Sequence, residues 1–197
     1  MKQQTFIFFG LSGSGKGTQA KLLIDFIKQK DQRDIIYLET GAKFREFSTE
    51  ASLTAKMTKD VMAKGGLLPE FLPIWIWTEY LVKHISGDEH LILDGLARRS
   101  HEAPILDSAI RFYKRENPII ISLNVSRDWA KEKLLSRGRS DDSLYDIEKR
   151  IDWYYQNVIP SIEFFKNNDY YKFIEINGQQ SIEDVFTEMI KKIGLND

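Results

Sequence analysis

A glycine-rich segment near the start of the chain constrains the fold more than any other feature. Residues 10–19 read Gly-Leu-Ser-Gly-Ser-Gly-Lys-Gly-Thr-Gln and directly follow the apolar run at residues 5–9. A helical pattern begins immediately afterwards, so the segment joins a predicted strand to a predicted helix. In that setting glycines let the backbone fold around a phosphate group with successive N–H groups pointing inward. The helix N-terminus and Lys16 add positive charge, and the segment therefore predicts a phosphate-binding loop (the P-loop).

Short apolar runs alternate with helical patterns along the rest of the chain. Such alternation is typical of an α/β protein built from βαβ units. The runs are continuous and rich in Ile, Leu and Phe, as expected for parallel strands that are covered on both faces. We therefore predict a doubly wound, five-stranded parallel sheet. Its predicted strands are residues 5–9, 35–38, 91–93, 119–125 and 172–176.

Two segments interrupt the alternation. Residues 40–85 are helical in pattern without an obvious strand, and Gly65-Gly66 and Pro69 separate two predicted helices. Residues 136–143 form a short polar run that contains two arginines and two aspartates. We predict a single domain over residues 1–197, with a core of about residues 1–39, 86–135 and 144–197. An inserted helical lobe (about residues 40–85) and a short lid (about residues 136–143) extend from this core.

The composition excludes several classes of function. The formal net charge of −1 provides no overall basic field for nucleic acid or an anionic membrane. The absence of cysteine excludes disulfides, thiol catalysis and a cysteine-ligated zinc site. No segment approaches the about 20 apolar residues that span a bilayer, and the N-terminus lacks the longer apolar run of a signal peptide. We expect a cytoplasmic monomer with neither nucleic-acid nor membrane partners.

The details of the P-loop indicate a family. In the general motif a Ser or Thr that binds Mg²⁺ follows the lysine, whereas Gly17 follows it here and Thr18 comes next. Gly-Lys-Gly-Thr-Gln resembles the loop of adenylate kinases and related nucleoside monophosphate kinases. Three further segments resemble theirs in the same order: Thr-Gly-Ala-Lys-Phe-Arg at residues 40–45, Gly-Leu-Leu-Pro-Glu at 66–70 and Asp-Gly-Leu-Ala-Arg at 94–98.

This resemblance covers residues 9 to about 165 and implies both a reaction and its site. The implied reaction is Mg²⁺-dependent transfer of the terminal phosphoryl group of ATP to a nucleoside monophosphate (NMP), with AMP favoured and no zinc required. By resemblance the P-loop binds ATP through Gly13, Ser14, Gly15, Lys16, Gly17 and Thr18. The NMP would be bound by Thr40, Gly41, Arg45, Leu68, Gly95, Arg98 and Glu102.

Arginines of the lid region complete the implied site. Residues 134–142 and 148–151 resemble the lid of short-form family members. By resemblance, Arg137 stacks on the base of ATP, while Arg139 and Arg150 reach the transferring phosphoryl group. A guanidinium group suits both tasks because it is flat for stacking and forked for oxygen atoms. The expected catalytic set is Lys16, Arg45, Arg98, Arg139 and Arg150.

Asp94 is the expected contact for the metal ion. It follows the apolar run at residues 91–93, and in P-loop enzymes an aspartate at such a strand end lies beside the loop and holds Mg²⁺. Because Gly17 offers no hydroxyl group, we expect Asp94 to matter more for the metal, through a bridging water molecule.

One position departs from the family pattern. Four residues after Arg98, adenylate kinases carry a glutamine that pairs with adenine, and this chain has Glu102. Glutamine both donates and accepts, whereas an ionised carboxylate only accepts. Glu102 can take the adenine amino group but leaves the ring nitrogen facing an acceptor, and a guanine edge with two donors would suit it better. The acceptor could therefore be GMP, CMP or UMP. A nucleotide-binding module without turnover is a further alternative, which retention of all five catalytic cations argues against.

Overall fold

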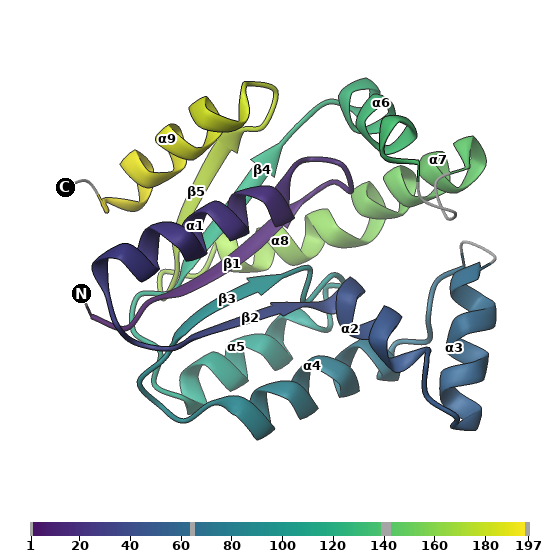
Figure 1. Ribbon diagram of the computed structural model, residues 1–197, viewed down its shortest axis with the longest axis horizontal. Coiled ribbons are helices and arrows are strands. Elements are labelled where there is room, and N and C mark those ends of the chain that lie inside the picture. The colour runs from purple at the N-terminus through teal and green to yellow at the C-terminus, as the bar shows by residue number, and fades with distance from the viewer. Residues whose placement is uncertain (1, 64–65, 139–142, 196–197) are drawn as a thin grey trace.

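The computed structural model describes residues 2–63, 66–138 and 143–195, which contain one five-stranded sheet (Figure 1). The strands lie in the order β2-β3-β1-β4-β5, and every neighbouring pair is parallel. The predicted doubly wound parallel fold is confirmed, and each strand end lies within one residue of its predicted place. The strands are β1 (Thr5–Gly10), β2 (Ile35–Glu39), β3 (His90–Asp94), β4 (Ile119–Asn124) and β5 (Lys172–Asn177).

Helices cover both faces of the sheet. On one face lie α1 (Lys16–Lys30) and α9 (Ile182–Ile193), and on the other lie α4 (Phe71–His84), α5 (Ala103–Phe112) and α8 (Ile159–Lys166) (Figure 1). Successive side chains of β1 alternate between these layers: Phe6 and Phe8 pack under α1 and α9, while Ile7 and Phe9 join the opposite core. This two-sided burial explains the uninterrupted apolar run. Within the described residues, no helix has the length and apolar character needed to cross a bilayer.

The described part of residues 40–85 forms three helices, one more than predicted. These are α2 (Thr40–Phe47), α3 (Leu53–Ala63) and α4. The additional break follows α2, where the Ser52 hydroxyl accepts a hydrogen bond from the Ala55 amide at 3.1 Å and so satisfies the start of α3. Helix α3 stands away from the sheet, whereas α4 lies alongside α5 and buries Trp77 and Leu81 in the core (Figure 1).

The long helix predicted near the C-terminal third contains a π-helical turn. It consists of α7 (Leu144–Trp153), η1 (Tyr154–Val158) and α8, and it follows α6 (Arg127–Arg137). The Ile159 amide donates to the carbonyl of Tyr154, five residues earlier. Pro160, in the first turn of α8, has no N–H group and would clash with the carbonyl four residues before it in a regular α-helix. The wider π turn accommodates this proline inside a continuous helix.

Candidate functional site

A cavity of about 1070 Å³ lies at the carboxyl ends of β1, β2 and β3. This edge is where open parallel sheets bind ligands. All of the predicted site residues that the structure describes line the cavity, although the chain supplies them from many separate segments. Arg139 lies outside the described residues. The lining residues among the predicted set are Gly13, Ser14, Gly15, Lys16, Gly17, Thr18, Thr40, Gly41, Arg45, Leu68, Asp94, Gly95, Arg98, Glu102, Arg137 and Arg150.

The P-loop folds tightly because two of its glycines adopt left-handed backbone. The φ angles are 86° at Gly13 and 89° at Gly15, a region that favours glycine. At Gly13 a Cβ would lie 2.9 Å from the Ala130 carbonyl oxygen, so the loop packs directly against α6. Gly15 is the N-cap of α1 and has no side chain to bond the first N–H groups of that helix. These N–H groups are therefore available to a phosphate.

Lys16 is held over the P-loop by backbone carbonyls. Its ammonium group donates hydrogen bonds to the carbonyl oxygens of Gly10 at 2.9 Å and Leu11 at 3.0 Å. Burial lowers the pKa of Lys16 to about 8, and the positive charge of Arg98 adds to this effect while Asp94 opposes it. A bound phosphate would provide a negatively charged partner for this desolvated ammonium group and so favour its charged form.

Asp94 lies beside the P-loop, as predicted for a metal contact. A Cβ on Gly17 would be 3.9 Å from both the Asp94 Oδ2 atom and the Tyr37 hydroxyl. Burial raises the pKa of Asp94, although Lys16 and Arg98 act in the opposite direction. Among the described residues, no three His, Cys, Asp or Glu side chains converge on a point that could hold a metal. A magnesium ion at Asp94 would therefore need phosphate and water oxygens as its other ligands.

Two arginines approach the cavity from the side of α2 and β3. Arg45 donates to Glu39 Oε1 at 2.9 Å, and about half of its side chain is exposed. Arg98 folds back so that its Nε atom donates to the Gly95 carbonyl at 2.9 Å. Gly95 has a φ of 74°, and a Cβ there would collide with the Arg98 guanidinium group. The backbone at position 95 therefore favours glycine, and a larger residue there would displace the Arg98 guanidinium group.

Two more arginines reach the cavity from the lid side. Arg137 ends α6, and Arg150 lies on α7, where its Nε atom donates to the Asp146 carbonyl at 3.4 Å. Helices α6 and α7 lie across from α2 and α3 in Figure 1, and both arginines line the same cavity as Arg45. The cavity therefore brings cationic groups from its two sides toward the P-loop, an arrangement suited to binding several phosphate groups at once.

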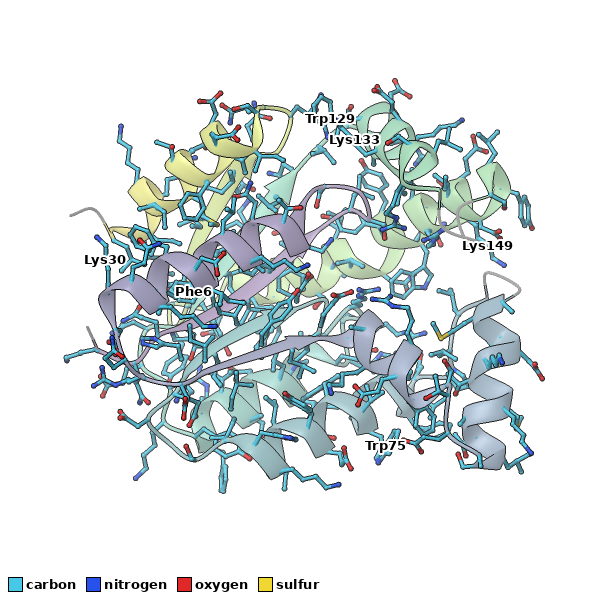
Figure 2. The ribbon with its side chains drawn as sticks, viewed as in Figure 1. Phe6, Lys30, Trp75, Trp129, Lys133 and Lys149 are labelled. Atoms are coloured by element: carbon cyan, nitrogen blue, oxygen red, sulfur yellow. The ribbon has the colours of Figure 1, made fainter. Side chains whose placement is uncertain are left out.

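The cavity also contains residues that the sequence analysis did not assign to the site. Arg99 lies over the Trp153 ring, 5.4 Å from its centre, and Lys133 lies 4.6 Å from the centre of the Trp129 ring (Figure 2 labels this second pair). Helical spacing in the sequence could have indicated two of these residues. Lys133 comes four residues after Trp129 on α6, so the two share a helix face. Trp153 comes three residues after Arg150 on α7 and shares a face with that predicted site residue.

Comparison with known proteins agrees with this geometry. The family model described as "Adenylate kinase" matches residues 8–170. The chain belongs to the adenylate kinase family. A curated adenylate kinase of Trichodesmium erythraeum is 34% identical over 194 residues, which cover 94% of this chain and 95% of that protein. Adenylate kinases of Prochlorococcus marinus (31% identical, covering 91% of this chain and 92% of that protein) and Azobacteroides pseudotrichonymphae (29%, 94% and 94%) are also similar. The resemblance drawn from the P-loop and the arginine segments is confirmed.

Glu102, the departure from the adenylate kinase pattern, is not an isolated carboxylate. Its side chain is only 2% exposed. The Oε2 atom accepts a hydrogen bond from the Arg98 amide at 2.8 Å, and the Oε1 atom accepts one from Arg99 Nη1 at 3.1 Å. The guanidinium group of Arg99 therefore offsets the negative charge that Glu102 was expected to present alone.

Proposed function

We propose that this chain catalyses reversible transfer of the terminal phosphoryl group of Mg·ATP to AMP, which produces two molecules of ADP. The observation that supports this most strongly is the single cavity that joins a P-loop to arginines on both of its sides. One nucleotide would place its phosphates on the P-loop. The second would place its phosphate against Arg45 and Arg98, which line the same cavity.

The reaction needs positioning and charge stabilisation more than it needs a nucleophile from the protein. Two phosphate groups that approach each other repel strongly, and fixed cations offset that repulsion where charge develops. Lys16 and the N-terminus of α1 would bind the β- and γ-phosphates of ATP. Arg45 and Arg98 would hold the phosphate of AMP in line for attack, and Arg150 would contact the transferring group together with Arg139. Arg137 would stack on the ATP base.

Magnesium fits this site as a partner of ATP. Asp94 would hold the ion through water beside Gly17, and the phosphate oxygens would provide the remaining ligands. When bound, the ion offsets negative charge on the β- and γ-phosphates. We further propose that the enzyme acts as a cytoplasmic monomer, because one chain supplies every described residue of the site and the sequence carries no cysteine.

The test is a panel of acceptors. Transfer from Mg·ATP to AMP, GMP, CMP, UMP and dAMP would be followed together with release of free phosphate, with and without a chelator of Mg²⁺. We expect AMP to be the preferred acceptor, with two ADP formed per AMP and no activity under chelation. Preference for another monophosphate would refute AMP as the acceptor. Binding of ATP without transfer to any acceptor would instead support a non-catalytic nucleotide-binding module.

A further inference from the structure

Arg99 and Glu102 form a buried ion pair on the wall of the cavity. The Arg99 Nη1 atom lies 3.1 Å from Glu102 Oε1, and the two side chains are 12% and 2% exposed. Both residues line the cavity on the side where Arg98 and Leu68 lie, which is the side proposed for the acceptor. Arg99 is distinct from the two arginines proposed to hold the acceptor phosphate. Arg45 bonds to Glu39, and Arg98 bonds to the Gly95 carbonyl.

The pair retains hydrogen-bonding capacity after its internal contacts are counted. A carboxylate offers about four acceptor positions, and Glu102 uses one for Arg99 and one for the Arg98 amide. A guanidinium group has five N–H donors. Arg99 uses one for Glu102 and one for the Leu68 carbonyl at 3.0 Å, while Glu70 lies 3.9 Å from its Nε atom. At least one acceptor on Glu102 and one donor on Arg99 therefore remain unused on two neighbouring residues that line the cavity.

We propose that Arg99 and Glu102 together read the base of the acceptor nucleotide. The Glu102 carboxylate accepts from the exocyclic amino group of adenine, and the Arg99 guanidinium donates to the adjacent ring nitrogen. This inference rests on the proposed function and names Arg99 as a specificity-determining residue for it. A single amide side chain presents a donor beside an acceptor. The ion pair presents the same pattern from two side chains, and it supplies the donor that Glu102 alone lacks.

The surroundings hold the guanidinium group in a defined position. Trp153 lies beneath it, with the ring centre 5.4 Å from the Arg99 Cζ atom, and the Leu68 carbonyl fixes one of its edges. The Arg98 amide fixes the Glu102 carboxylate in turn. Base discrimination depends on donors and acceptors that are held rigidly in this way, because a mismatched base then leaves buried polar groups unpaired.

The experiment compares three variants with the wild type. Arg99→Met removes the donor, and Arg99→Met/Glu102→Gln replaces the ion pair by one amide that carries both a donor and an acceptor. Arg111→Met is the matched control, because Arg111 also pairs with a carboxylate, Asp107, at 2.9 Å but lies outside the cavity. Steady-state transfer to AMP and to GMP, calorimetric binding of each monophosphate without ATP, and thermal unfolding would be measured for all four proteins.

We expect Arg99→Met to lower kcat/KM for AMP by about 10- to 100-fold, the usual effect of losing a hydrogen bond that involves a charged group. The KM for ATP should stay unchanged. The preference should shift toward GMP, because the remaining carboxylate suits the two donors on the guanine edge. The double variant should recover selectivity for AMP, and Arg111→Met should behave as the wild type.

Other outcomes would overturn the inference. The inference is wrong if Arg99→Met loses transfer to AMP and to GMP equally together with stability, and the double variant fails to restore transfer to AMP. In that case the pair only braces the loop against Leu68. Unchanged selectivity in Arg99→Met would also refute it. The calorimetry separates the two proposals. If the wild type binds AMP without turnover, the proposed function fails. Comparison of AMP binding by the wild type and Arg99→Met then still tests the inference. A wild type that binds no monophosphate would overturn both.

Discussion

Removing the charge of Lys16 should stabilise the protein in the absence of nucleotide while it greatly slows phosphoryl transfer. The ammonium group has two carbonyl partners, yet burial lowers its pKa from the ordinary value of 10.5 to about 8. A lowered pKa means that the folded state holds this proton less tightly than the unfolded state does. We therefore predict that Lys16→Met, which keeps the length of the side chain, increases the free energy of unfolding at pH 7.

The size of the effect follows from the pKa. A fall from 10.5 to about 8 is about 2.5 units, and at 1.36 kcal/mol per unit it corresponds to roughly 3 kcal/mol at pH 7. This figure already includes the attraction between Lys16 and Asp94, because Asp94 contributes to the same pKa. The carbonyls of Gly10 and Leu11 would lose a donor, which water in the open cavity can replace. We expect a net gain of about 1–3 kcal/mol.

The pH dependence distinguishes desolvation from other causes. Between pH 8 and 10.5 the unfolded state binds more protons at this lysine than the folded state does, so wild-type stability gains from the site as the pH rises. The advantage of Lys16→Met should therefore shrink above pH 8 and vanish near pH 10.5. Other groups whose pKa differs between the folded and unfolded states, such as Tyr37, whose pKa burial raises, are common to both proteins and cancel in the difference.

The assay is urea unfolding of the wild type, Lys16→Met and Lys28→Met at pH 7, 8, 9 and 10, with phosphoryl transfer measured in parallel. Lys28 is exposed on the same helix, so its replacement should change the free energy of unfolding by no more than about 0.5 kcal/mol. Transfer by Lys16→Met should fall by about 100- to 1,000-fold. A variant that is less stable than the wild type at pH 7, or a difference that does not depend on pH, would refute the reasoning.

Two further substitutions probe the acceptor side and the opposite edge of the sheet. Gly95→Ala should raise the KM for AMP and leave the KM for ATP unchanged, because a Cβ displaces the Arg98 guanidinium and a φ of 74° adds about 1–2 kcal/mol of strain. Steady-state kinetics check this, and an unchanged KM for AMP would contradict it. Arg115→Met should lower the free energy of unfolding by about 3–5 kcal/mol, because the buried Glu89 carboxylate, 3.4 Å away, loses its cationic partner and keeps the hydrogen bonds from Ser86 and Gly87. Urea unfolding checks this; a loss below about 1 kcal/mol, or lost activity in the folded variant, would argue against it.

The features that could be predicted from the sequence are those encoded locally. Each strand is an apolar run bounded by polar or turn residues, and its ends fall within one residue of the prediction. The P-loop motif, together with the apolar run before it and the helical pattern after it, predicts a strand, a loop and a helix in that order. Since parallel strands share one carboxyl edge, residues that follow different strands, such as Lys16, Thr40 and Asp94, meet there without any knowledge of the tertiary structure.

The features that could not be predicted depend on contacts between distant segments. Arg99 and Glu102 are only three residues apart, but the hydrogen bond from Arg99 to the Leu68 carbonyl, 31 residues away, cannot be predicted from the sequence. An aromatic residue such as Trp153 on an amphipathic helix fits core packing equally well, so only the cavity reveals it. The pKa of Lys16 likewise requires the burial that the folded loop creates.

The π-helical turn at Tyr154–Val158 influences which side chains of the preceding helix face the cavity. Each residue added to a helix rotates everything before it by about 100° relative to everything after it. Arg150 and Trp153 line the cavity, while Ser161 and Phe165, beyond the turn, are fully buried. A relative with a regular α-turn here would need one residue fewer to keep the cavity-lining residues before the turn and the buried residues after it in the same orientations. Insertions and deletions in this short segment would therefore rotate Arg150, the proposed catalytic arginine, relative to the sheet and leave the sheet itself unchanged.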